Sequence, residues 1–197
     1  MPAEITVYTD YVCPFCLLCE PLIREVANER GASIRWRPFE LRPAPVPTLR
    51  VEDDYLPAVW KSSVYPMAER LNIPITLPGV SPQPRTDKAF EVFALAQEQD
   101  LGDKFSVRVL RGFFQEEKDI GDIDVLVSLA QDVGMDGKEV RQILLDGTYR
   151  AAHQKALKYA QEVAKISVVP TVIIGDKRYD GFPDKSWLNN ALDSIPT

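Results

Sequence analysis

Two cysteines near the start of the chain, Cys13 and Cys16, are separated by Pro14 and Phe15 and follow a short apolar run. A Cys-x-x-Cys at the junction of a strand and a helix is typical of thiol–disulfide exchange. The first sulfur then lies at the helix N-terminus, where unpaired backbone N–H groups favour a negative charge. Because the thiolate is the attacking species in this chemistry, the spacing predicts that Cys13 attacks and that Cys16, one turn deeper, resolves the mixed disulfide.

A third cysteine, Cys19, follows Cys16 by three residues. On a helix it lies about 9 Å along the axis from Cys13, beyond the roughly 7 Å across which a disulfide can join two Cα atoms. Cys19 shares an apolar stripe with Leu22 and Ile23, which predicts a small buried side chain. An auxiliary redox thiol is the alternative. Iron–sulfur ligation lacks a fourth thiolate, and a continuous helix would splay the sulfurs, so no metal is expected.

Length and charge narrow the classes of protein that fit. The 197 residues suffice for one large core, or for a core domain with an inserted subdomain. The net charge of -6 argues against a nucleic-acid surface. We see neither a secretory signal pattern nor an apolar run of the roughly 18 residues that a membrane span needs. The cytoplasm is therefore the expected compartment, where a Cys-x-x-Cys is seldom a structural disulfide.

The pattern of apolar residues predicts strands at both ends of the chain and helices between them. Residues 5–8 and 33–41 are the first expected strands, and the helix between them begins at Pro14 and ends at Gly31. Three prolines in residues 43–47 mark the exit from this unit. Helical patterns follow, with a kink or break expected at Pro66 and helix caps at Thr86, Asp122, Asp136 and Asp184. A further helix is expected over 151–165. After it, Gly175-Asp176 predicts a hairpin between strands 171–174 and 177–179.

Three segments resemble the thioredoxin-fold proteins of the DsbA family. Residues 10–16 (DYVCPFC) and 169–175 (VPTVIIG) carry the general signature, and residues 36–43 (WRPFELRP) resemble the FrnE-like branch. Members are thiol–disulfide oxidoreductases, so the resemblance implies this activity. It also implies an α/β thioredoxin fold, β-α-β then α-β-β-α, with a large helical insertion. Residues 1–45 and 151–197 would form the thioredoxin-like domain, and residues 46–150 the inserted helical subdomain.

The resemblance also assigns a second half of the site. Pro170 is expected to be cis and to pack against the cysteine pair, exposing the backbone of Val169 to an extended substrate segment. An ordinary trans proline that begins a strand is the alternative. We expect substrate contacts from Val169, Pro170, Pro14 and Phe15. Neither a cofactor nor a metal is needed, because the electrons reside on the cysteine pair.

Several residues carry weaker signals. Val168 stands two positions before the proline, where the family usually has a small residue, and would narrow the groove beside the cysteines. Asp10, which precedes the helix, is expected to be an ordinary polar residue of the turn. His153 reads as a solvated or half-buried helix residue. Aromatic residues of the insertion at helical spacing are expected in the core more often than along a groove near the cysteines: Tyr55, Trp60, Tyr65, Phe113 and Phe114.

Two other functions fit the same order of elements. The 2-hydroxychromene-2-carboxylate isomerases and kappa-class glutathione transferases are similar, but typically carry serine at the first cysteine position and no cysteine at the second. Retention of both Cys13 and Cys16 favours an oxidoreductase. A redox-controlled chaperone or binding module is the third hypothesis. The expected partners are protein or small thiol and disulfide substrates, glutathione included, with no nucleic acid and no membrane. The sequence leaves the oligomeric state and the direction of electron flow open.

Overall fold

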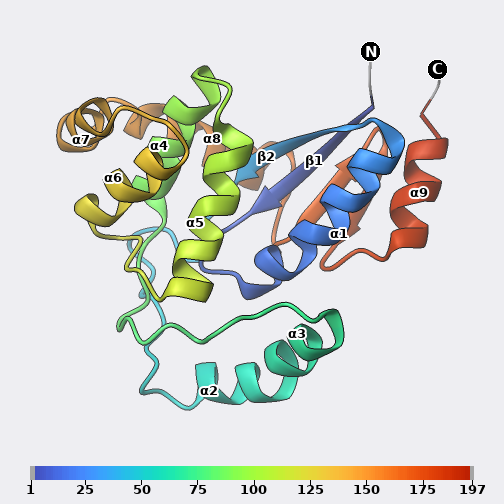
Figure 1. Ribbon diagram of the computed structural model, residues 1–197, viewed down its shortest axis with the longest axis horizontal. Coiled ribbons are helices and arrows are strands. Elements are labelled where there is room, and N and C mark those ends of the chain that lie inside the picture. The colour runs from blue at the N-terminus through green and yellow to red at the C-terminus, as the bar shows by residue number, and fades with distance from the viewer. Residues whose placement is uncertain (1–2, 196–197) are drawn as a thin grey trace.

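The computed structural model describes residues 3–195 and contains a four-stranded sheet with helices around it (Figure 1). The strands are β1 (Glu4–Thr9), β2 (Ser33–Pro38), β3 (Thr171–Ile174) and β4 (Lys177–Asp180), in the order β2-β1-β3-β4. β1 and β2 are parallel, whereas β3 runs antiparallel to both β1 and β4. This arrangement, with helices inserted between β2 and β3, is the fold that the resemblance implies.

Helix α1 (Pro14–Arg30) begins directly after the first cysteine. Cys13 is the extended N-cap residue and Pro14 is the first helical residue, where its missing N–H costs no hydrogen bond. At the other end Gly31 adopts the left-handed conformation, with φ of 62°, that closes the helix. The apolar side of α1 is buried, and the helix contacts α9 (Lys185–Asp193) as well as β2.

The helices between β2 and β3 fall into two groups in Figure 1. One group packs beside the sheet and comprises α4 (Asp87–Glu98), α5 (Gly102–Glu116), α6 (Ile123–Asp132) and α7 (Gly137–Asp146). The other lies near the start of α1 and comprises α2 (Tyr55–Val59) and α3 (Tyr65–Leu71), joined by a π-helical turn over Trp60–Val64. Helix α8 (Arg150–Lys158) contacts both α4 and β2, so it ties the inserted helices to the sheet.

Most helix boundaries lie close to the expected positions. The side chains of Asp122, Asp136 and Asp184 each accept a hydrogen bond from a backbone N–H of the following helix. The break expected at Pro66 takes the form of the π-helical turn just before it, where the Tyr65 N–H donates to the Trp60 carbonyl. In the aromatic set Trp60, Phe113 and Phe114 are buried, whereas Tyr55 and Tyr65 are exposed.

Three details differ from the sequence predictions. The second strand ends at Pro38 rather than at residue 41, because the next residues turn toward the cysteine loop. The helix expected over 151–165 becomes π-helical from Tyr159 to Val163. Thr86 stands at the N-cap position of α4, but its hydroxyl makes no capping bond and donates to Asp10 instead.

Candidate active site

The loop between β1 and α1, residues 10–13, presents the first cysteine. The backbone N–H of Cys13 donates to the carbonyl of Asp10 over 3.1 Å, and the N–H of Cys16 donates to the carbonyl of Cys13 over 3.0 Å. These bonds close a tight turn that leads straight into α1. The Cys13 side chain is therefore held at the N-terminus of the helix, and Cys16 lies one turn further in.

The loop before β3 meets Cys13 from the other end of the chain. The Val169–Pro170 peptide bond is cis, and the Cys13 thiol donates to the Val169 carbonyl over 3.3 Å. Pro170 and Val169 are buried, whereas Pro14 and Phe15 are partly exposed. The structure thus brings all four predicted substrate-binding residues next to or onto the Cys13–Cys16 segment, and their contact with a substrate stays a prediction.

Access to the first cysteine is narrow, because only 4% of the surface of Cys13 is exposed. By contrast, Val168 is 38% exposed beside the same loop. A reacting disulfide therefore has little exposed surface of Cys13 to contact. The large side chain at Val168, which departs from the family pattern, stands on the surface near this approach.

Cys16 and Cys19 are completely buried, and all three cysteines are free thiols. Burial raises the pKa of Cys16 well above its usual value; the hydrogen bond with Cys13 and the charges of Cys13 and Cys19 add to this, while Thr9 opposes it. The Cys19 thiol donates to the carbonyl of Cys16 over 3.4 Å, and burial likewise raises its pKa. Cys16 is thus kept as a thiol, which suits a group that reacts second.

Asp10 is 1% exposed and accepts two hydrogen bonds that close the loop. The Leu41 N–H donates to one carboxylate oxygen and the Thr86 hydroxyl to the other, each over 2.7 Å. Burial raises the pKa of Asp10 to about 6, and the charge of Glu40 adds to the shift, although both hydrogen bonds oppose it. The carboxyl group is therefore a buried structural link between the cysteine loop and two distant segments.

Comparison with known proteins identifies the family. The model of the DSBA-like thioredoxin domain matches residues 4–193. The chain belongs to this family. It is also 44% identical over 193 residues to the uncharacterized protein YwbO of Bacillus subtilis, which covers 98% of this chain and 96% of YwbO.

Two solved structures support the fold of this DsbA-like protein. A probable DsbA oxidoreductase of Streptomyces coelicolor, SCO1869, superimposes with a TM-score of 0.76 at 20% identity, over 96% of this chain and 88% of that one. A 2-hydroxychromene-2-carboxylate isomerase gives a TM-score of 0.78 at 16% identity, over 96% and 94% of the two chains. At such identities the likeness establishes the α/β thioredoxin-like fold with its helical insertion, and it does not choose between the two activities.

The prediction for His153 is wrong. This residue of α8 is 4% exposed, and its Nε2 lies 2.6 Å from Oε1 of the buried Glu40. The imidazole stacks on Phe90 with ring centroids 5.3 Å apart, and Phe90 in turn stacks on Tyr11 of the cysteine loop at 4.4 Å. His153 is therefore part of the packing beneath the loop rather than a solvated helix residue.

Sequence reasoning missed the residues that fix the cysteine loop from a distance. Glu40 stood out only as part of the family segment 36–43, and Thr86 only as a helix cap. The available signal for Glu40 was a polar residue just after a strand and beside a proline-rich loop, but that signal does not predict its partner His153, 113 residues away.

Within residues 3–195, no group of three or more His, Cys, Asp or Glu side chains is arranged to hold a metal ion. In the same range no helix has the length and apolar character needed to cross a membrane.

Proposed function

We propose that this DsbA-like protein is a thiol–disulfide oxidoreductase in which Cys13 attacks and Cys16 resolves. The observation that carries the proposal is the position of the Cys13 sulfur, at the start of α1 and 3.3 Å from the Val169 carbonyl. Cys16 lies within the next turn, fully buried and out of reach of a substrate. Cys13 thus keeps a small exposed surface for a substrate, whereas the fully buried Cys16 would react only with its neighbour.

The reaction conserves sulfur, protons and electrons. The Cys13 thiolate attacks one sulfur of a substrate disulfide, forms a mixed disulfide and releases the other sulfur as a thiolate that takes up a proton. Cys16 then loses its proton and attacks the Cys13 sulfur, which releases the second substrate thiol. Two electrons pass from the cysteine pair to the substrate, and the reverse sequence oxidises a dithiol. An external thiol or disulfide partner restores the starting form.

A series of single cysteine variants tests the proposal. We expect Cys13→Ser to abolish the protein's catalysis of peptide disulfide reduction, measured with dithiothreitol as the final reductant. Cys16→Ser should still attack and should accumulate a mixed disulfide, which intact-mass spectrometry detects as an adduct of the peptide mass. Cys19→Ser is the matched control, since a serine hydroxyl can donate to the Cys16 carbonyl as the Cys19 thiol does. It should keep most of the activity.

Two outcomes would contradict the proposal. A Cys13→Ser variant that reduces the peptide at the wild-type rate would remove the nucleophile from the mechanism. A glutathione-dependent isomerase activity that survives Cys16→Ser would favour the isomerase hypothesis, which needs no resolving cysteine. An equal loss of activity in Cys19→Ser would give Cys19 a redox role in place of a packing role.

Three finer assignments belong to the same proposal. The segment 36–43 supports placement in the FrnE-like branch of the family. The net charge of -6 supports thiol or disulfide substrates over nucleic acid, with glutathione as one candidate thiol. We place the reaction in the cytoplasm, where a cysteine pair of this kind works against a reducing thiol pool. The reduction potential of the Cys13–Cys16 couple, measured against glutathione, tests this last assignment.

A further inference from the structure

A small pocket adjoins the cysteine loop on the side of Val12. Its volume is about 60 Å³, and it is walled by three segments that are remote in sequence: the cysteine loop, residues 41–56 and residues 83–86. Val12, the residue before Cys13, forms part of the wall and is partly exposed. Leu41, three residues after the end of β2, also lines the pocket and is 42% exposed. The pocket and the nucleophile therefore share one tight turn.

Hydrogen bonds among the walls hold this pocket in shape. The guanidinium of Arg85 donates to the carbonyls of Arg42 and Val46, each over 2.9 Å. The backbone N–H of Gln83 donates to the Leu49 carbonyl over 2.7 Å, and Asp10 accepts bonds from the other two segments. The cavity is thus preformed rather than dependent on a ligand.

Hydrogen bonds within the protein occupy four of the polar side chains of the lining, and the Arg42 and Thr48 side chains also line the pocket. Asp10, Gln83, Arg85 and Thr86 all make hydrogen bonds within the protein. A polar ligand group would find these donors and acceptors already paired. What the walls offer instead is aliphatic: Val12, Leu41, Leu49, Leu56 and Pro84. The aliphatic part of the lining thus suits an apolar group.

Size limits the apolar group further. An apolar cavity of about 150 Å³ holds a benzene ring, so the much smaller 60 Å³ observed here favours a branched aliphatic side chain over an aromatic one. We propose that this pocket binds an aliphatic side chain, of valine or leucine size, next to the reacting cysteine of a peptide substrate. The inference rests on the proposed function and names its substrate class. Glutathione, which has no aliphatic side chain beside its cysteine, would leave the pocket empty.

The test measures rates with peptides that differ in one residue. Each short peptide carries a single cysteine in a disulfide with a chromophoric thiol, and the flanking residue is Gly, Val, Leu, Phe, Asp or Lys. One series varies the residue before the cysteine and the other the residue after it. We expect Leu or Val in one series to raise kcat/KM about tenfold over Gly, with Phe, Asp, Lys and oxidised glutathione close to Gly. Equal rates throughout, or a preference for Phe or a charged residue, would overturn the proposal.

A change in the pocket wall should alter the preference itself. Leu49→Ala enlarges the cavity, so we expect the Phe peptide to gain several-fold in kcat/KM while the Leu peptide loses. Leu145→Ala is the matched control, because Leu145 is 63% exposed on α7 and remote from the pocket lining. Its selectivity should equal that of the wild type. If Leu49→Ala fails to fold, the wild-type peptide series decides alone.

The two proposals fail in different ways. Wild-type protein that reduces none of the peptides, or that does so independently of Cys13, defeats the oxidoreductase assignment. Wild-type protein that reduces all of them through Cys13 at one rate defeats only the pocket. An unchanged order of preference in a folded Leu49→Ala variant would likewise defeat the pocket alone.

Discussion

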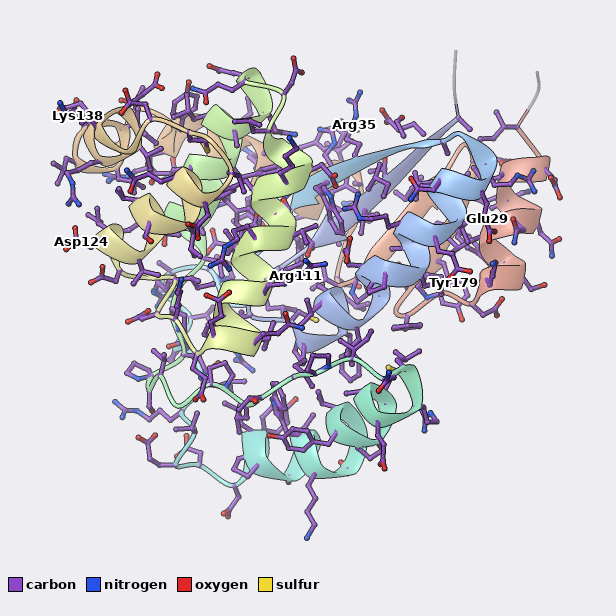
Figure 2. All side chains as sticks on the ribbon, viewed as in Figure 1. Glu29, Arg35, Arg111, Asp124, Lys138 and Tyr179 are labelled. Carbon is purple, nitrogen blue, oxygen red and sulfur yellow. The ribbon has the colours of Figure 1, made fainter. Side chains whose placement is uncertain are left out.

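Two clusters of carboxyl groups, one on α1 and one at the cysteine loop before it, are stabilised in different ways. Glu20, Asp10 and Glu40 are buried, whereas the Asp103 side chain is 42% exposed. In the arginine cluster, Glu20 and Asp103 share the guanidinium of Arg24, and the Trp36 indole also donates to Asp103 over 2.7 Å. A second guanidinium, that of Arg111, lies 3.8 Å from Glu20, and Figure 2 shows Arg111 on the side of α5 that faces α1. Buried charge in this cluster thus has opposite charge beside it.

In the loop cluster of Asp10, Glu40 and His153, no arginine among residues 3–195 makes a hydrogen bond to either carboxyl group. Asp10 is held by an N–H and a hydroxyl, and Glu40 by the His153 imidazole. The pKa directions differ accordingly. Burial alone would raise the pKa of Asp103, but hydrogen bonds from Arg24 and Trp36 outweigh it and lower that pKa. Burial raises the pKa of Asp10 to about 6, because the hydrogen bonds from Leu41 and Thr86 offset only part of its effect.

The two clusters should therefore differ in how their contribution to stability depends on pH. The arginine cluster fastens α1 to α5 through the guanidinium of Arg24, which stays charged, and through Asp103, whose pKa is lowered. The loop cluster fastens the cysteine loop with a carboxyl group that changes charge near neutrality. We therefore expect the response of this protein to pH to concentrate at the cysteine loop.

Of the variants that probe the two clusters, Asp10→Asn should have the largest effect, on the pH dependence of the free energy of unfolding. The pKa of Asp10 is raised from 3.8 to about 6 on folding, so the folded state favours the protonated form. The associated stability is full below pH 4 and is lost as the pH rises through 6, a total of about 3 kcal/mol. The asparagine amide stays neutral and can serve Leu41 and Thr86 at every pH. The free energy of unfolding of the variant, minus that of the wild type, should therefore rise between pH 4 and pH 7.

Urea unfolding at pH 4, 5, 6 and 7 measures that difference. Subtraction of the wild-type curve removes the other titrating groups, since both proteins share them. A difference that stays constant with pH would show that Asp10 keeps its ordinary pKa, and the proposed distinction between the clusters would fail at its main point.

Arg24→Met tests the other cluster and should cost about 2 kcal/mol at pH 7. Removing one partner of a buried pair costs about 3–5 kcal/mol, but Arg24 is 35% exposed and Arg111 remains near Glu20, which lowers the cost. The matched control is Arg30→Met on the same helix. Arg30 is equally exposed, at 35%, but its partner Asp193 is 59% exposed, so this change should cost under about 1 kcal/mol. Equal costs for the two variants, measured in urea, would show that the burial of Glu20 has no consequence.

The sequence predicted the features that depend on near neighbours. Pro14, Gly31 and the three aspartate caps act within one helical turn, and each lies where its local pattern places it. Thr86 shows the limit, because its local pattern is that of a cap while its hydroxyl is used by Asp10, 76 residues away. The pocket beside Val12 has walls from three distant segments. No local pattern encodes such a cavity, since it depends on how the loops pack against one another.

His153→Leu gives the smallest expected effect and tests whether the loop cluster acts as a unit. The change leaves Glu40, which is 5% exposed, without its imidazole partner, and an unpaired buried acceptor costs about 1–3 kcal/mol. Among the described residues, the His153 Nδ1 is itself buried without a hydrogen-bond partner, so its removal offsets part of that cost. We expect a net loss near 1 kcal/mol. Glu40→Leu combined with His153→Leu should then cost less than the sum of the two single changes, because neither partner is left alone. Additive costs in urea unfolding at pH 7 would mean that the 2.6 Å contact contributes nothing, and that packing on Phe90 alone holds α8 beneath the cysteine loop.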